Sequence, residues 1–152
     1  MSWCGWCWPD VSREGVELIR ELFVLLAVPA TSLEGRKQGL DLVFDVYLHP
    51  DVEYREDPRW PGSDSYRGID AVRARFHDYL EAMQVSLELD DVIDAGDRVV
   101  ALYRAIGTGA GSGSPYEQAW AWVIELKDGR IADFQAYLDR EAALAAAGLG
   151  PL

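Results

Sequence analysis

Ionisable side chains stand in two segments whose pattern is typical of β-strands with one apolar face. Over residues 51–57, strict alternation puts Tyr54 and Glu56 on the same face as a valine. Over residues 98–107, Arg104 shares its face with a leucine and an isoleucine. If both faces line the interior, Glu56 and Arg104 are a buried acid and base that must pair or border a water-filled pocket. The alternative is that both are exposed at a sheet edge, or form an ion pair that serves only the fold.

Aromatic side chains could supply the walls of such a pocket. Trp120 and Trp122 share one strand face, and Phe76 and Tyr79 belong to a segment with helical spacing. If they point inward, the pocket is flat and apolar, and it suits a hydrophobic or aromatic ligand with one polar group. Alternation does not say which face is inside, so the two tryptophans could instead cover a dimer interface.

The C-x-x-C motif of Cys4 and Cys7 has the spacing of a redox-active dithiol. Such a dithiol becomes reactive when a strand delivers it to the N-terminus of a helix, and no strand can precede Cys4. A closed zinc site needs four ligands, and only His49 and His77 could join the two thiols. We therefore expect residues 1–10 to form an irregular N-terminal arm, and we expect neither a metal nor a cofactor.

The glycine-rich segment GTGAGSGS over residues 107–114 resembles a phosphate-binding loop. A dinucleotide-binding loop joins a strand to a helix, whereas this segment joins two predicted strands, and Ser112 replaces the third glycine of the motif. The glycines recur at every second position. We therefore expect them to leave one strand face bare, so that a neighbouring element can approach closely.

Length and charge restrict the classes of partner. The chain has 152 residues, of which 49% are hydrophobic, and this supports one compact domain, which we expect over residues 11–149. A formal net charge of −12 repels nucleic acids and anionic membranes. The sequence shows no apolar run of about 20 residues and no signal peptide. Two cysteines give no disulfide framework, so we expect a cytoplasmic protein.

Hydrophobic periodicity divides the chain into helices near its N-terminus and centre, then strands, then a last helix. Prolines and glycines mark the boundaries between these segments. The order predicts an α+β fold, in which a mainly antiparallel sheet packs against the N-terminal and central helices. The predicted helices cover residues 12–27, 40–48, 68–83 and 139–148, and the predicted strands cover residues 51–57, 85–93, 98–111, 117–126 and 130–138.

Five pieces of the sequence, in this order and spacing, resemble a known family. They are VEYREDP, YRGIDAVRARF, DAGDRVV, WVIELKDGRI and FQAYLDREAALAAAGL. Together they resemble the SnoaL-like polyketide-cyclase branch of the nuclear transport factor 2-like superfamily, over about residues 11–149. The resemblance implies a cone-shaped, strongly curved sheet that wraps against helices and encloses an apolar pocket. It also implies a homodimer formed through the outer face of the sheet, and cofactor-free acid–base chemistry.

Carried over by position, the resemblance places Glu56 where ketosteroid isomerases have their general base, or Asp57 if the alignment slips by one residue. Leu22 and Trp122 stand where those isomerases have a tyrosine and a protonated aspartate. Compared with limonene epoxide hydrolases of the superfamily, Tyr54 and Arg104 match catalytic residues. Two aspartates of that catalytic cluster are replaced by Ile106 and Ala136. These departures argue against both specific reactions.

The residues and the resemblance together predict a cofactor-free lyase, isomerase or cyclase acting on a hydrophobic carbonyl compound. In this hypothesis Glu56 takes a proton next to the carbonyl group, Arg104 stabilises the resulting anion, and Tyr54 donates a hydrogen bond. Trp120, Trp122, Phe76 and Tyr79 contact the ligand. The alternative is a non-catalytic module of the same fold, which binds a hydrophobic ligand or mediates dimeric interaction.

Overall fold

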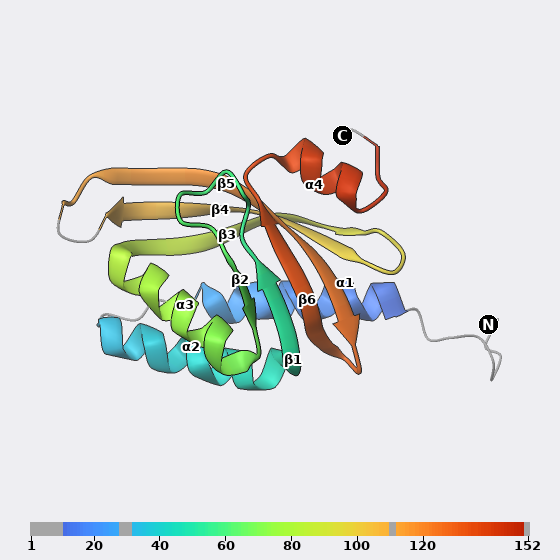
Figure 1. The fold of residues 1–152 in the computed structure, drawn as a ribbon, viewed down its shortest axis with the longest axis horizontal. Helices are drawn as coiled ribbons and strands as arrows, with labels where there is room; N and C mark the ends of the chain where they lie inside the picture. The colour runs from blue at the N-terminus through green and yellow to red at the C-terminus, as the bar shows by residue number, and fades with distance from the viewer. Residues whose placement is uncertain (1–10, 28–31, 110–111, 151–152) are drawn as a thin grey trace.

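The fold is built on one curved, unclosed sheet of six strands in the order β2-β1-β6-β5-β4-β3 (Figure 1). The computed structural model describes residues 11–27, 32–109 and 112–150, so the predicted N-terminal arm with Cys4 and Cys7 lies outside the described residues. Neighbouring strands are antiparallel except β1 and β6, which are parallel. This confirms the predicted α+β fold with a mainly antiparallel sheet. The strands are β1 Leu48–Arg55, β2 Ser65–Arg67, β3 Met83–Asp94, β4 Val99–Gly109, β5 Pro115–Lys127 and β6 Arg130–Tyr137.

Helices cover both faces of this sheet (Figure 1). On the inner face, α1 (Val11–Leu26) packs on β3 and β4, while α2 (Leu33–Tyr47) packs on α3 (Ile69–Ala82). On the outer face, the short helix α4 (Arg140–Ala146) packs on β4, β5 and β6. Two separate apolar clusters result, a large one inside the curve of the sheet and a small one under α4. Among the described residues, no helix is long and apolar enough to cross a membrane.

Helix α2 begins seven residues before the predicted start, because contacts with α3 support a segment that is polar and carries two glycines. Ser32 caps the helix by accepting a hydrogen bond from the Gly35 backbone N–H at 3.0 Å. Each glycine costs about 1 kcal/mol relative to alanine in a helix interior. Arg36 offsets this cost by donating to the carbonyl oxygens of Leu80 and Met83 at the end of α3, at 3.2 and 3.4 Å.

Strand β1 also begins earlier than predicted, at Leu48, and β2 was not predicted at all. Three residues are too short to show an alternating pattern, so β2 depends on its pairing with β1. Tyr54 lies opposite Tyr66 in that pair, and on the other face Arg67 donates to Glu53 Oε1 at 2.8 Å. The loop that carries β2 thereby becomes a wall beside the end of β1.

Of the period-two glycines that the structure describes, only Gly107 permits the close approach of a neighbouring strand; Gly109 is the last residue of β4, and Gly113 lies in the turn that follows. A Cβ atom at Gly107 would lie 1.9 Å from the carbonyl oxygen of Gln84 in β3, so a larger residue would separate the two strands. The segment leads from β4 into β5 and not into a helix. It therefore lacks the helix N-terminus on which a dinucleotide-binding loop depends.

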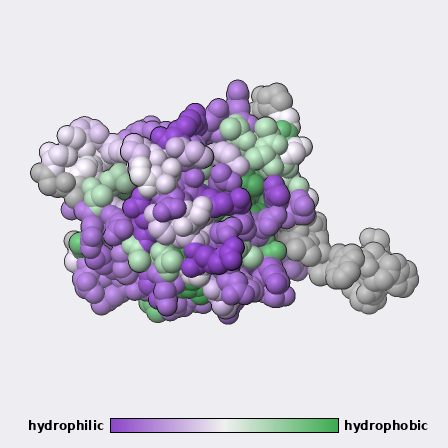
Figure 2. All heavy atoms as spheres, viewed as in Figure 1, coloured by the Kyte–Doolittle hydropathy of each residue, from purple (hydrophilic) through white to green (hydrophobic). Residues whose placement is uncertain are grey.

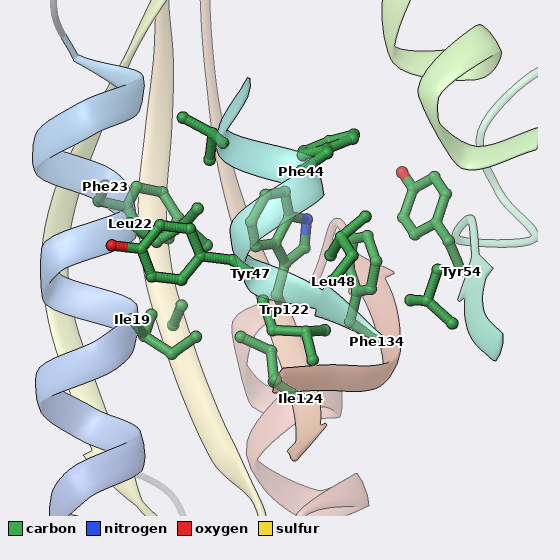
Figure 3. Packing of buried hydrophobic residues seen from close by; sticks show 14 of the residues in the cluster. Ile19, Leu22, Phe23, Phe44, Tyr47, Leu48, Tyr54, Trp122, Ile124 and Phe134 are labelled. Atoms are coloured by element: carbon green, nitrogen blue, oxygen red, sulfur yellow. The ribbon is translucent and has the colours of Figure 1, made fainter. Parts of the chain in front are cut away.

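The inner apolar cluster is rich in aromatic rings, as Figure 3 shows. The ring of Trp122 lies 5.4 Å from that of Phe23 and 5.3 Å from that of Phe134. Phe134 in turn stacks on Tyr54 at 4.5 Å. By contrast, the face of the molecule seen in Figure 2 is largely hydrophilic, and its apolar side chains gather on α4. The aromatic cluster therefore lies inside the curve of the sheet, where a ligand can be shielded from water.

Candidate functional site

A cavity of about 890 Å³ lies between the inner face of the sheet and the helices α1, α2 and α3. Its volume falls within the range of about 300–1,000 Å³ that is usual for small-molecule sites. Four aliphatic residues border the cavity and remain exposed, namely Leu25, Leu33, Leu42 and Val46. The lining is rich in aromatic residues, namely Tyr47, Tyr54, Trp60, Phe76, Tyr79, Tyr103, Tyr116, Trp120 and Trp122.

Glu56 follows the last residue of β1 and presents its carboxylate to this cavity, although the residue is only 5% exposed. Arg75 donates from Nε to Oε2 at 2.8 Å and from a terminal nitrogen to Oε1 at 3.4 Å. The backbone N–H of Asp64 donates to Oε1 at 3.0 Å, and the Tyr79 hydroxyl donates to Oε2. Because four donors occupy the two oxygens, the buried charge is satisfied by the protein itself.

Two tyrosines extend this network along the cavity wall. The hydroxyl oxygens of Tyr54 and Tyr79 lie 3.0 Å apart, and since the Tyr79 proton is directed to Glu56, Tyr54 is the donor of that bond. Burial raises the pKa of the Tyr54 hydroxyl well above its usual value of about 10, and the nearby charge of Glu56 adds to this effect. Tyr54 is therefore neutral at ordinary pH. The result is a directed hydrogen-bond chain from Tyr54 through Tyr79 to Glu56.

Arg75 is fixed in place by both charge and aromatic contact. Burial acts against its charge, but the hydrogen bonds and the negative charge of Glu56 raise the pKa of Arg75 above its usual value. Its guanidinium carbon also lies 4.9 Å from the ring centre of Tyr79 and 5.7 Å from that of Tyr66. Glu56 and Arg75 therefore form an oriented ion pair beside the cavity.

The structure does not bring Arg104 to Glu56, so the predicted contact between them is wrong. In β4 the residues facing the inner cluster are Tyr103 and its alternate neighbours, which places Arg104 on the outer face. There its Nε lies 3.0 Å from Asp90 Oδ1, and a terminal nitrogen lies 3.2 Å from Glu88 Oε2. Arg75 takes the place beside Glu56. Sequence could have indicated Arg75, because it lies three residues after the apolar Val72 and four before Tyr79, and so projects from the same side of the helix.

The remaining predicted ligand contacts all lie inside. Phe76 and Tyr79 project from α3, and Trp120 and Trp122 project from the inner face of β5. The ring of Trp120 lies 5.3 Å from that of Trp60 in the loop after β1. Of the two orientations left open by alternation, the tryptophans take the one that faces the cavity.

Asp57, the alternative to Glu56, is also buried but has a structural role and does not line the cavity. Its Oδ2 accepts the backbone N–H of Leu138 at 2.7 Å, and its Oδ1 accepts that of Arg59 at 2.8 Å. Burial acts against the charge of Asp57, but these bonds and the Arg59 side chain lower its pKa below the usual value. Asp57 thus joins the end of β1 to the residue that follows β6.

Metal binding by clustered side chains finds no support in the described parts of the chain. Within residues 11–27, 32–109 and 112–150, no three histidine, cysteine, aspartate or glutamate side chains are grouped to hold a metal ion. The chemistry that the described site offers is hydrogen bonding and proton transfer by Tyr54, Tyr79 and Glu56 within apolar walls.

Solved structures with the same fold share low sequence identity with this chain. A protein from Jannaschia sp. CCS1, described as a candidate SnoaL-like polyketide cyclase, is 19% identical, with a TM-score of 0.69 over 97% of this chain and 100% of that chain. An NTF2-like protein from Burkholderia xenovorans LB400 is 22% identical, with a TM-score of 0.64 over 91% and 98% of the two chains. A protein from Catenulispora acidiphila DSM 44928 with a ketosteroid isomerase-like fold, solved with trimethylamine, is 17% identical, with a TM-score of 0.59 over 88% and 93%.

A search of curated proteins gave no match. The model of the SnoaL-like domain family matches residues 37–134, which include β1, β2, α3 and every residue of the hydrogen-bond chain. Folds of this family are associated in general with ligand binding and with isomerase or cyclase activity. On the strength of this match over more than half of its length, the chain belongs to the SnoaL-like domain family.

Proposed function

We propose that the cavity binds a hydrophobic carbonyl compound and transfers a proton at the carbon next to the carbonyl group. The protein would then be a cofactor-independent isomerase, cyclase or lyase. The observation that carries this proposal is the chain from Tyr54 through Tyr79 to Glu56, which lies in the wall of an aromatic cavity. A buried carboxylate connected to the ligand space is the usual arrangement for general base catalysis.

The proposed step moves three protons by one position each. The substrate C–H proton passes to the Tyr54 oxygen, the Tyr54 proton to Tyr79, and the Tyr79 proton to Glu56 Oε2. The electron pair of the C–H bond moves toward the carbonyl oxygen and gives an enolate. Arg75 then carries a positive charge that Glu56 no longer balances, which favours the negative charge of the enolate. Return of the proton to another carbon, ring closure or loss of a leaving group completes the reaction.

The walls of the cavity favour a flat apolar molecule. Phe76, Trp120 and Trp122 offer ring faces and edges, and the exposed rim of aliphatic side chains continues the apolar surface outward. A polar group on such a ligand finds its partners in the inner wall, near Tyr54 and Tyr79. This supports an aromatic or multi-ring compound with a carbonyl group as the substrate class.

One observation favours a second candidate, a protein that holds such a ligand without reacting it. Four donors already occupy the Glu56 carboxylate, so that a ligand reaches it only through Tyr79. Both candidates require ligand binding in the cavity. Only the first requires proton transfer to and from the ligand, and this difference can be measured.

The test is hydrogen exchange of β-tetralone in heavy water, followed by loss of its α-proton signals in NMR. We expect the wild-type protein to accelerate exchange, and Glu56→Gln to slow it by about 100-fold to 10,000-fold, because the proton has no acceptor. Tryptophan fluorescence should show that Glu56→Gln still binds β-tetralone. Glu88→Gln, on the outer face, is the matched control and should behave as wild type.

Two outcomes would contradict the enzymatic proposal. Exchange at the wild-type rate in Glu56→Gln would show that this carboxylate is not the proton acceptor. Saturable binding of β-tetralone without any acceleration of exchange in the wild-type protein would favour the binding function instead.

A further inference from the structure

The exposed aliphatic side chains of this protein gather at one place, the opening of the cavity. Five large hydrophobic residues are exposed in the described parts of the chain, and four of them line the cavity. These four form the aliphatic rim, namely Leu25, Leu33, Leu42 and Val46. Leu42 and Val46 are 70% and 61% exposed, so most of their surface is open to solvent. An exposed apolar patch that continues the wall of a cavity indicates a surface that a ligand covers.

The opening lies on the side of α2 that faces away from α3. On the other side, three polar pairs join α2 to α3, which runs beside it in Figure 1. They recur at every fourth residue of both helices, and they are Lys37 with Glu81, Asp41 with His77, and Asp45 with Arg73. Leu42 and Val46 each come one residue after a member of these pairs, about 100° further around the helix, so they point away from α3. The pairs therefore close one flank of α2 and leave the aliphatic rim on the open flank.

The cavity is much larger than the two-ring ligand that its aromatic wall favours. It measures about 890 Å³, near the upper end of the usual range for small-molecule sites. The rim residues of α2, from Leu33 to Val46, extend over about 20 Å of helix. Between them, Gly39 also lines the cavity, and a Cβ atom at Gly39 would meet no other atom within 4 Å. A second, extended part of a ligand therefore has room along α2.

Resting on the proposed function, we propose that the ligand carries a long uncharged alkyl chain, which leaves the aromatic part of the cavity and lies along the aliphatic rim. The ring end, with its carbonyl group, lies near Tyr54 and Tyr79, where the hydrogen-bonding groups are. Aliphatic side chains offer no hydrogen bonds, so this part of the site selects a chain that needs none. The substrate class is thereby narrowed to aromatic ketones with an alkyl substituent.

Charge favours an alkyl chain over a second copy of this protein as the occupant of the rim. Each rim residue stands next to an acidic residue or one helical turn after one. These acidic residues are Glu21, Glu34, Asp41 and Asp45. A symmetric dimer formed through the rim would bring this patch against itself, in a protein whose formal net charge is −12. An uncharged alkyl chain meets no such repulsion.

The test compares β-tetralone with 6-hexyl-β-tetralone, whose chain extends from the end of the ring system opposite the carbonyl group. Tryptophan fluorescence titrations give the hexyl gain, which is the ratio of the affinities for the two compounds. Full burial of one methylene raises affinity about fourfold, so a groove open to water on one side gives about twofold per carbon. We therefore expect a hexyl gain of about 50-fold in the wild-type protein. A hexyl gain below about threefold would overturn the inference.

Variants of the rim locate the bound chain. Leu42→Gln combined with Val46→Gln should reduce the hexyl gain about tenfold. The matched control is Val24→Gln, which replaces an exposed residue of α1 outside the cavity lining and should keep the gain. Gly39→Leu should reduce the gain by filling the groove, while its urea midpoint should not fall, because leucine favours a helix more than glycine does. A wild-type hexyl gain in the double variant or in Gly39→Leu would overturn the inference.

The same measurements separate this inference from the proposed function. If the hexyl gain is present but the protein accelerates exchange of neither ketone, the proton transfer fails and the alkyl site stands. If exchange is accelerated without the hexyl gain, only the alkyl site fails. Sedimentation velocity tests the other occupant. A wild-type dimer that dissociates in the double variant, with an unchanged hexyl gain, would assign the rim to a second copy and overturn the inference.

Discussion

The two faces of the sheet carry the same pair of chemical groups in opposite surroundings. On the inner side, Arg75 meets Glu56, whose side chain is 2% exposed, beside the cavity. On the outer side, Arg104 meets Asp90, and these side chains are 37% and 27% exposed. Water screens the outer pair and can replace either partner, whereas the inner carboxylate depends on its arginine. The difference shows that burial, more than the identity of the two residues, decides which carboxylate is held in one fixed orientation.

The largest effect should come from breaking the inner pair. Arg75→Met leaves the Glu56 carboxylate buried without its arginine, and we expect a loss of about 3 kcal/mol in the free energy of unfolding. Urea denaturation measures this loss. Adding Glu56→Gln to Arg75→Met should restore much of the stability, since no charge then remains to be compensated. A loss below about 1 kcal/mol in Arg75→Met would mean that solvent reaches Glu56 and that the contrast between the faces is overstated.

A smaller effect should appear at alkaline pH, because the inner face holds buried tyrosines. Burial raises the pKa of Tyr54 and of Tyr103 well above the usual value of about 10. The stability contributed by their neutral forms is complete below pH 10 and falls as the pH rises, because tyrosines of the unfolded chain lose their protons first. We therefore expect the urea midpoint of unfolding to fall as the pH rises from about 8 to about 11, a range that includes the usual tyrosine pKa. The decline should be shallower in Tyr54→Phe, and an unchanged slope would contradict the burial of this hydroxyl.

The smallest effect should come from the outer pair. Arg104→Gln removes an exposed arginine from a network that also contains Arg140, which donates to Asp90 Oδ2 at 2.7 Å. We expect the urea midpoint and the β-tetralone exchange rate to equal those of wild type within error, since exposed ion pairs contribute little. A loss of β-tetralone exchange in Arg104→Gln would show that Arg104 contributes to the site, and it would contradict the assignment of Arg75 as the arginine of the site.

Much of the fold could be predicted from sequence because its elements follow simple periods. Alternation correctly put Tyr54 and Glu56 on one side of the first predicted strand, and helical spacing correctly put Val72 and Phe76 on one side of α3. The early start of α2 could not be predicted, because it depends on the contacts of Arg36 with α3. Strand β2 could not be predicted either, because three residues carry no period.

The site was predicted in part, and its errors have a physical origin. Alternation groups the residues of β4 into two faces but does not say which face is inside, and so Arg104 was assigned to the wrong one. Arg75 lies one helical turn after the apolar Val72 on α3, yet an arginine beside apolar positions is more often solvated than buried.

The parallel pairing of β1 with β6 has a consequence for how the molecule is made. Leu48 pairs with Ile131, and the bond from the Leu138 N–H to Asp57 spans 81 positions, so the segment that carries Glu56 depends on contacts with β6 and the residue after it. Contacts this distant in sequence slow folding, because a long loop must close before they stabilise anything. We therefore expect the segment that carries Glu56 to become fixed only after the ribosome has released β6. Until then, we expect the Glu56 carboxylate to remain in water, although Tyr54, Tyr79 and Glu56 all precede β6 in the sequence.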